Sequence, residues 1–357
     1  MSRPTSATIH VDALRHNLAR VRALAPKSRV MAVVKADGYG HGLERAARAL
    51  QGADAFGVAA LSDAERLRAA GLSQRIVLLS GFDEPADLPL LQRLDIDTVV
   101  HHDSQLAMLE AARDARVRVW LKIDSGMHRL GFAPERAREV HGRLRACAAV
   151  ADDIALMTHF ARSYEYAEHA NARQLQTFAE ATQGLPGPRS LANSAAALGW
   201  PASHGDWIRP GGALYGISVV EGRTGSDFGL EPAMTLSTRL IAINRVCAGE
   251  PVGYGGAFVC PRAMAIGIAA IGYGDGYPRH AAPGTMVLVR GRRAPIVGRV
   301  SMDLLAIDLD GMADAAVGDA VVLWGRGLPV EEVARAADTI GYELSCGITR
   351  RVRFIED

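Results

Sequence analysis

Cysteine is scarce in this chain, and its spacing excludes two classes of protein. The sequence has 357 residues and four cysteines, Cys147, Cys247, Cys260 and Cys346. They lie far apart and form no CxxC pair, so we expect neither a disulfide framework nor a zinc site. We predict instead that the cysteines are small apolar residues of the core.

The chain also lacks an excess of charge, a signal segment and a membrane-spanning run. Its 40 basic and 39 acidic residues leave a net charge of +1, so no global field attracts a nucleic acid or an anionic membrane. The first residues, MSRPTSATIHVDALRHN, have no apolar signal-peptide core, and no later run is long enough to cross a bilayer. We expect a cytoplasmic protein that binds neither nucleic acid nor membrane.

Two patterns that could suggest a nucleotide or a metal lack the residues that such sites need. The segment IGYGDGYP, residues 271–278, has neither the Lys-Ser/Thr pair of a P-loop nor a following helix, and we predict a turn. His101 and His102 precede Asp103, but adjacent strand residues face opposite ways, and Asp103 is placed to cap the next helix. We predict no metal site.

What the sequence does contain is a lysine, Lys35, at the end of an apolar run. Residues 30–34 have the length and β-branched content of a strand buried on both faces. Burial there would disfavour the ammonium form and leave an amine nucleophile able to condense with a carbonyl. The alternative at this point is that the chain turns into solvent at Lys35, because glycines follow it.

Eight short apolar segments alternate with segments of helical periodicity over roughly the first 230 residues. This alternation indicates βα units with a parallel sheet. Eight units fit a closed (β/α)8 TIM-type barrel, although an open doubly wound sheet has the same pattern. The predicted strands are residues 30–35, 55–60, 76–80, 98–101, 117–124, 154–159, 190–193 and 207–210.

The remainder of the chain has β-rich runs punctuated by glycine in place of helical periodicity. We predict strands at residues 234–246, 265–271, 285–289, 294–297, 304–309 and 320–323, and a late helix at 329–340. The α/β barrel domain is therefore expected at 1–229, and a mostly β domain at 230–357. Roughly the first ten residues are candidates to pack with the second domain.

Polar residues gather at the predicted carboxyl ends of the barrel strands, which is where barrels of this kind carry their chemistry. Singly, each has a structural explanation, such as a helix cap or a salt bridge. Together on one rim they predict an active site. They are Lys35, Lys122, residues 124–129, residues 158–159, Asn193 with Ser194, and Arg209.

The loops after the seventh and eighth strands are suited to hold a phosphate. They carry Asn193, Ser194, Gly211 and Gly212, which offer free amides, a hydroxyl and close approach of the backbone. A phosphate site beside the amine of Lys35 points to pyridoxal 5'-phosphate. A phosphosugar aldolase would need the same parts.

The ordered motifs of the chain resemble one family, the bacterial alanine racemases that depend on pyridoxal 5'-phosphate. They are AVVKADGYGHG, LKIDSGMHRLGF, THFA, NSA, RPGGALYG, VGYGGAF, GYGDGYPR and GRVSMD. The resemblance implies a homodimer that interconverts L- and D-alanine, supplying D-alanine for peptidoglycan or catabolising it. The alternative is a fold-type III amino-acid decarboxylase, which shares the lysine strand.

Two catalytic bases follow from this resemblance. It implies that Lys35 forms the Schiff base with the cofactor and is one base, and that Tyr254, delivered by the second subunit, is the other. A racemase removes the α-proton from one face and returns one to the other, so it needs an acid/base on each side of the cofactor.

The resemblance also assigns the contacts around the cofactor and the substrate. It implies that Arg209 faces the pyridine nitrogen and that His159 hydrogen-bonds both Arg209 and Tyr254. The expected cofactor-binding residues are Lys35, Tyr39, His159, Asn193, Ser194, Arg209, Gly211, Gly212 and Tyr342. The expected substrate-binding residues are Arg129, Met302 and Tyr273. Met302, with Asp303, is expected to come from the partner subunit, and Tyr273, with Tyr342, to narrow the entrance to small amino acids. Lys122, carbamylated in many members, is expected to orient Arg129, and Asp303 to support Met302.

Overall fold

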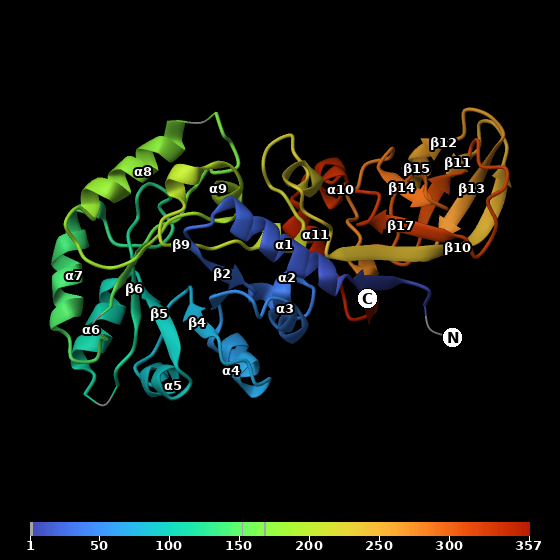
Figure 1. Ribbon diagram of the computed structural model, residues 1–357. Coiled ribbons are helices and arrows are strands. Elements are labelled where there is room, and N and C mark those ends of the chain that lie inside the picture. The colour runs from blue at the N-terminus through green and yellow to red at the C-terminus, as the bar shows by residue number, and fades with distance from the viewer. Residues whose placement is uncertain (1–2, 114, 152, 168) are drawn as a thin grey trace. The chain divides into compact units, whose positions relative to one another are not determined.

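The computed structural model describes residues 3–113, 115–151, 153–167 and 169–357 (Figure 1). The chain divides into two compact units. We call them the barrel unit, Arg15–Leu214 with Val220–Arg223, and the β unit, Met1–Leu14 with Tyr215–Val219 and Thr224–Asp357. The boundary between residues 229 and 230 stays a prediction.

In the barrel unit, eight strands of the described residues pair in parallel and close into a ring, in the order of the sequence. The ring closes where Arg29 and Val30 pair with Trp207 and Ile208. The strands are β2 Arg29–Val33, β3 Ala55–Val58, β4 Arg75–Leu78, β5 Ile96–Val100, β6 Val119–Lys122, β7 Ala155–Met157, β8 Arg189–Ser190 and β9 Trp207–Ile208. All eight predicted strands are confirmed, and the barrel replaces the open-sheet alternative.

Helices connect the strands, as a TIM-type barrel requires (Figure 1). They are α1 Val11–Leu24, α3 Leu43–Ala49, α4 Leu61–Ala69, α5 Asp87–Arg93, α6 Asp103–Ala111, α7 Ala137–Ala146, α8 His169–Ala181 and α9 Ser194–Gly199; the short segment α2 Lys35–Tyr39 is a turn with left-handed residues. The predicted cap of α6 is wrong. His102 caps this helix, accepting from the Ser104 amide at 3.2 Å, because Asp103 instead pairs with Arg136 at 2.7 Å.

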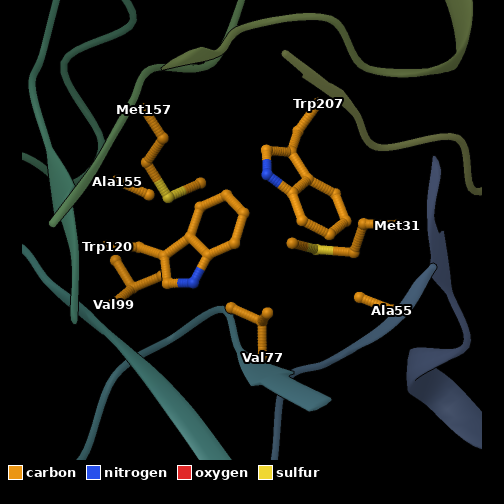
Figure 2. Close-up of a cluster of buried hydrophobic side chains, with 8 residues drawn as sticks. All are labelled: Met31, Ala55, Val77, Val99, Trp120, Ala155, Met157 and Trp207. Atoms are coloured by element: carbon orange, nitrogen blue, oxygen red, sulfur yellow. The ribbon is translucent and has the colours of Figure 1, made fainter. Parts of the chain in front are cut away.

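A layer of side chains fills the inside of the barrel (Figure 2). Trp120 and Trp207 meet edge to face, with their ring centroids 5.6 Å apart. The other members are smaller or unbranched, which leaves room for the two indoles: Met31, Ala55, Val77, Val99, Ala155 and Met157. Because strand side chains alternate between faces, this layer belongs to the inward-pointing positions of the strands.

A polar cluster lies at the amino-terminal ends of the same strands. The Asp97 carboxylate is fully buried and accepts from Arg75 Nε at 2.6 Å, Arg118 Nε at 2.6 Å and Trp120 Nε1 at 2.7 Å. The Arg29 guanidinium stacks 4.2 Å above the Trp207 ring. A buried charge needs such partners, so this end of the barrel is a satisfied structural network.

The β unit is built on an eight-stranded sheet of the described residues, in the order β13-β16-β15-β14-β17-β10-β1-β18. Its long strand β10 pairs with β17 over residues 236–239 and with β13 over residues 240–246, with a register shift between Leu240 and Ala242. The strands are β1 Ser6–Ile9, β10 Met234–Val246, β13 Met264–Ala269, β14 Met286–Val289, β15 Arg292–Val297, β16 Leu305–Asp308, β17 Ala320–Trp324 and β18 Arg353–Glu356. The six predicted strands are confirmed, whereas β1 and β18 were not predicted.

The late helix predicted at 329–340 is confirmed but ends at Ala336, and a second helix, which was not predicted, follows it. They are α10 Val330–Ala336 and α11 Gly341–Cys346. Asp338 has a φ of 50°, and Ile340 is extended with a φ of −115° and a ψ of 152°. A helix cannot continue through either conformation, so the chain restarts at Gly341.

Two smaller expectations have mixed outcomes. Cys260 is buried as predicted and Cys147 is half-buried, but Cys247 and Cys346 are exposed and are not core residues. Within the described part of the chain, no helix has the length and hydropathy needed to span a membrane.

Candidate active site

Lys35 lies at the carboxyl end of the barrel, two residues after β2. The Val33 amide donates to the Pro210 carbonyl, and the Val34 amide donates to the Gly57 carbonyl, each at 2.9 Å. These bonds hold the end of the lysine segment between β3 and the loop that follows β9. Lys35 is half-buried there, so the sequence-based alternative of a lysine fully in solvent does not hold.

The chain leaves Lys35 in an unusual left-handed turn. Ala36, Asp37, Gly38 and Tyr39 all have positive φ, between 52° and 63°. Non-glycine residues seldom adopt this conformation, and such strain is concentrated at functional sites. A Cβ built on Gly38 would lie 2.9 Å from the Ala46 Cβ, so the turn packs tightly on α3. The predicted loop is therefore an ordered turn that fixes Tyr39.

Arg209 is buried at the end of the eighth barrel strand. Its Nη1 donates to Ser190 Oγ at 2.7 Å, and its Nη2 donates to the Thr158 carbonyl at 2.6 Å and the Leu191 carbonyl at 3.2 Å. Burial lowers the pKa of Arg209 to about 10, which leaves it charged at neutral pH. Sequence reasoning missed Ser190 as its partner. The only local signal was a serine on a short buried strand.

His159 lies beside this guanidinium. Arg209 Nη2 is 3.4 Å from His159 Nδ1, and since a guanidinium has no acceptor, Nδ1 accepts and the proton of the neutral ring is on Nε2. Burial, followed by the charges of Arg209, Lys122, Arg129 and Lys35, holds the pKa of His159 well below its ordinary value. The imidazole is therefore neutral at physiological pH.

Lys122 ends β6 and is almost fully buried. Burial lowers its pKa to about 8, and the charges of Arg209, Arg129 and Lys35 add to this, against an opposing effect of Asp124. The structure thus brings together the four cations that the sequence placed on one rim. A site in which neighbouring cations lower the pKa of a buried lysine favours an anionic ligand.

The loop that carries Arg129 is shaped by Asp124. Its Oδ1 accepts from the amides of Gly126, Met127 and His128, each at 3.0 Å. These bonds hold a left-handed residue, His128, with a φ of 55°, directly before Arg129. Arg129 itself is exposed. The loop is therefore preorganised, while the guanidinium at its tip remains accessible.

Three residues predicted to hold a phosphate, Tyr39, Ser194 and Gly211, lie together. Ser194 Oγ accepts from the Gly211 amide at 2.8 Å and from the Ala213 amide at 3.3 Å. A Cβ built on Gly211 would lie 2.3 Å from the Tyr39 hydroxyl oxygen, so only glycine fits there. Hydroxyls, backbone amides and nearby cations are the donor set that a phosphate group needs. The residues present fit such a group.

Asn193 and Gly212 are adjacent to this cradle. The Asn193 side chain caps α9, accepting from the Ala196 amide at 3.2 Å, and it also accepts from Ser163 Oγ at 2.8 Å. Gly212 begins the 3-10 turn Gly212–Tyr215. Asn193 therefore has a structural task, and its contact with a cofactor stays a prediction, as does that of Gly212.

The β unit carries the other predicted residues. Tyr254 is 71% exposed, at the start of the 3-10 turn Tyr254–Gly256, and Met302 is 52% exposed. Tyr273 is 38% exposed, in the 3-10 turn Tyr273–Asp275, and Tyr342 is half-buried in α11. Large apolar side chains left open to this degree are candidates for contact with a ligand or another chain.

Comparisons with known proteins agree along the chain. Residues 9–219 match the N-terminal domain of alanine racemase, and residues 233–356 match its C-terminal domain. An alanine racemase of Shewanella sp. (strain ANA-3) is 56% identical over 347 residues, which is 97% of either chain. The crystal structure of the biosynthetic alanine racemase from Pseudomonas aeruginosa is similar with a TM-score of 0.96, 46% identity and 99% coverage of both chains. That of the alanine racemase from Acinetobacter baumannii has a TM-score of 0.95 and 38% identity, covering 99% of this chain and 100% of that one.

Proposed function

The chain belongs to the alanine racemase family, and on that premise we propose that it interconverts L- and D-alanine with pyridoxal 5'-phosphate held by Lys35 and with Lys35 and Tyr254 as bases. The relatives that match nearly the whole length of the chain are alanine racemases, which supports this activity. The decarboxylase alternative is not favoured.

The observation that carries the cofactor proposal is the arrangement at the barrel rim. A lysine, a hydroxyl–amide cradle and two buried cations, Lys122 and Arg209, belong to the same end of one barrel. This set fits a phosphorylated aldehyde. When bound, pyridoxal phosphate supplies an electron sink for the negative charge left at Cα when the α-proton departs.

Arg209 would control how strongly the cofactor ring withdraws electrons. We propose that its guanidinium faces the pyridine nitrogen of the cofactor. Its pKa of about 10 keeps it protonated at pH 7, so it can donate a hydrogen bond but does not release a proton to a pyridine nitrogen. Arg209 would therefore leave the ring nitrogen of a bound cofactor unprotonated, which would restrain side reactions such as transamination. Ser190, Thr158 and Leu191 hold the guanidinium in place for this task.

Recognition of the substrate carboxylate is proposed for Arg129 and for the Met302 amide. Asp124 preorganises the loop of Arg129, and Lys122 lies near it in the same cationic group. Tyr273, together with Tyr342, would narrow the entrance to small amino acids. The neutral imidazole of His159 would accept from Arg209 at Nδ1 and donate from Nε2 to Tyr254.

The assembly that we propose is a homodimer with shared active sites. Residues 1–229 would form the cofactor-binding barrel, and residues 230–357 would contribute to the site of the partner. The exposure of Tyr254 and Met302 supports this proposal, since both would be covered in a dimer. Cytoplasmic location, and supply of D-alanine for peptidoglycan or its catabolism, belong to the same proposal.

A coupled assay tests the activity. Purified protein loaded with pyridoxal phosphate should form D-alanine from L-alanine, measured beside L-serine as a second substrate. Carbon dioxide release from ornithine, arginine or lysine without D-alanine would favour the decarboxylase instead.

The two-base assignment has its own test in Tyr254→Phe. The equilibrium constant fixes the ratio of kcat/KM in the two directions, so net racemisation rates cannot separate the two bases. The exchange of the α-proton with deuterated water is therefore measured for each enantiomer. We expect exchange from L-alanine to fall by about 10² or more while exchange from D-alanine, assigned to Lys35, persists. Equal losses for both enantiomers would contradict the assignment.

A further inference from the structure

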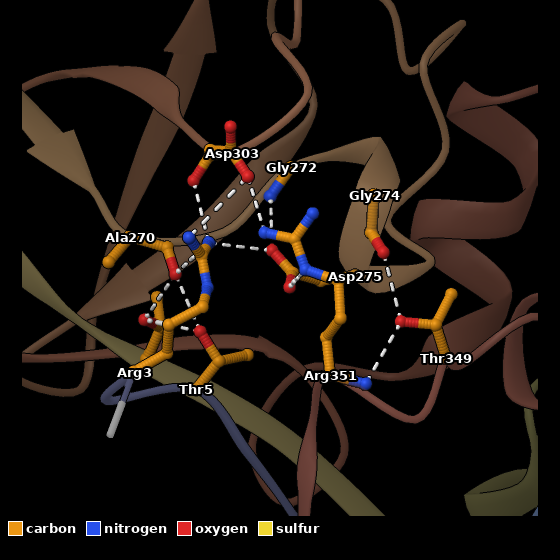
Figure 3. Close-up of polar contacts among 10 residues, drawn as sticks. Arg3, Thr5, Ala270, Gly272, Gly274, Asp275, Asp303, Thr349 and Arg351 are labelled. Carbon is orange, nitrogen blue, oxygen red and sulfur yellow. Dashed lines mark hydrogen bonds and ion pairs between the residues drawn. The ribbon is translucent and has the colours of Figure 1, made fainter. Parts of the chain in front are cut away.

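A buried carboxylate in the β unit, Asp275, is not used by the mechanism above. It lies in the glycine-rich segment 271–278, which the sequence predicted to be a turn, and its side chain is fully buried. Figure 3 shows that the side chains of Arg3 and Arg351, from opposite ends of the chain, reach it. Burying a carboxylate costs free energy unless it is paired, so the partners of Asp275 show which segments it connects.

Two arginines neutralise Asp275. Arg3 Nη2 donates to Asp275 Oδ2 at 2.8 Å, and Arg351 Nε lies 3.2 Å from Asp275 Oδ1 (Figure 3). The Gly272 amide donates to Asp275 Oδ2 at 3.1 Å. The carboxylate therefore ties the N-terminal segment and the C-terminal segment to one turn.

The same two arginines hold Asp303. Arg3 Nη2 donates to the Asp303 carbonyl at 2.9 Å, and Arg351 Nη2 donates to Asp303 Oδ1. The hydrogen bond from Arg351 lowers the pKa of Asp303. The four side chains carry two positive and two negative charges, so the cluster is balanced in charge.

The backbone joins this cluster to two proposed substrate-binding residues. The Tyr273 amide donates to the Ser301 carbonyl at 3.0 Å, and the Gly274 amide donates to the Met302 carbonyl at 2.9 Å. A Cβ built on Gly272 would lie 2.2 Å from the Ser301 carbonyl oxygen. The glycines of this segment thus permit two loops to lie directly against each other.

The segment after α11 is tied to the same turn. Thr349 Oγ1 donates to the Gly274 carbonyl at 2.9 Å, and the Thr349 amide donates to the Asp275 carbonyl at 3.2 Å (Figure 3). A Cβ on Gly276 would lie 2.4 Å from the Gly347 carbonyl oxygen. The segment that leads out of the helix of Tyr342 is therefore packed on the turn of Tyr273.

We propose that Asp275, with Arg3 and Arg351, is a positioning centre that sets the placement of Tyr273 and Met302 and thereby substrate size selection and affinity. The inference rests on the proposed function of those two residues. The proposal requires no contact between alanine and any of the three charged side chains. Their effect is transmitted through the Ser301–Tyr273 and Met302–Gly274 backbone bonds, whose loss would let the two loops separate.

The test compares Asp275→Asn, Arg351→Gln and Arg3→Gln in the holoenzyme. A matched control is Arg293→Gln, which breaks another arginine–carboxylate pair of the β unit, to Glu332 at 2.7 Å. We expect the KM for alanine to rise about tenfold, with a smaller change in kcat, and the kcat/KM ratio of serine to alanine to rise. Bound-cofactor absorption and the control variant should stay as in wild type.

A second readout does not depend on turnover. In apoprotein and holoenzyme alike, amide hydrogen exchange at Tyr273 and Gly274 should become faster in Asp275→Asn, because these amides bond to residues 301 and 302. Arg351→Lys keeps the charge and should restore part of the KM effect. If Asp275→Asn does not fold, Arg3→Gln, whose site is 32% exposed, carries the test.

Two results separate this inference from the proposed function. If wild-type protein forms no D-alanine, the proposed function fails. If wild-type protein racemises alanine, but the variants lower only thermal stability and leave KM, the serine-to-alanine ratio and the two exchange rates unchanged, the cluster is merely structural and the inference is overturned.

Discussion

Arginine or lysine side chains gather at both ends of the barrel, but only at the amino-terminal end are they paired with a buried carboxylate. At the amino-terminal end, Arg75 and Arg118 share one buried carboxylate, Asp97, and Arg29 stacks on Trp207. At the carboxyl end, Lys35, Arg129 and Arg209 all lower the pKa of Lys122, and Asp124 opposes them. The first cluster is satisfied within the protein, whereas the second has an excess of positive charge, which we propose is balanced by an anionic ligand.

This difference shows how a structural cluster can be told from a functional one. A network whose charges are matched and hydrogen-bonded contributes to folding, and removing one member leaves a buried charge unpaired. A network in which like charges lower one another's pKa values costs stability in the absence of ligand, which is a common property of binding sites. Substitutions at each end of the barrel test this distinction between a structural and a functional cluster.

The largest effect is expected for Lys35→Ala at the carboxyl end. The chain has three lysines, Lys27, Lys35 and Lys122, so borohydride reduction followed by peptide mapping identifies the one that carries the cofactor. We expect the label on Lys35, and loss of both activity and cofactor absorption in the variant. A label on Lys122, whose lowered pKa also makes it nucleophilic, would reassign the site.

A stability effect is expected at the opposite end, in Asp97→Asn. Two half-buried guanidinium groups and the Trp120 indole would lose their anionic acceptor, so the free energy of unfolding should fall by about 1–3 kcal/mol, measured by urea denaturation. The KM for alanine should not change. Asp95→Asn is the control, because Asp95 is 69% exposed and its pair with Arg118 contributes no more than about 1 kcal/mol. A raised KM in Asp97→Asn would break the distinction between the two ends.

The smallest effect is a pH dependence that originates at Lys122. Its pKa is lowered to about 8 in the folded protein, from 10.5 in the unfolded chain, so between these values the unfolded chain binds more protons. Below pH 8 the buried charge therefore opposes folding, and stability should rise as the pH increases from 8 to 10.5. Urea unfolding of the apoprotein measures this rise. Lys122→Met should flatten it, whereas Lys27→Met should not.

Part of this molecule could be predicted because the relevant signals are local. The eight barrel strands and β10 follow from apolar runs and their periodicity, which report burial along a few residues. Lys35, Lys122 and Arg209 were placed on one rim because the carboxyl ends of parallel strands meet there. The assignments of Tyr254 and Met302 depended on the resemblance of whole motifs and had no support from pattern alone.

Only the tertiary structure shows which side chains pair and which residues adopt irregular backbone conformations, because hydrophobic periodicity does not encode either. Three examples are the left-handed turn after Lys35, the break between α10 and α11 at Ile340, and the cap of α6 by His102. Sequence alone determined which segments are buried and which residue types lie at strand ends. It could not show that Arg3 and Arg351 meet at Asp275, because charge pairing depends on distance in space, and these residues are far apart along the chain.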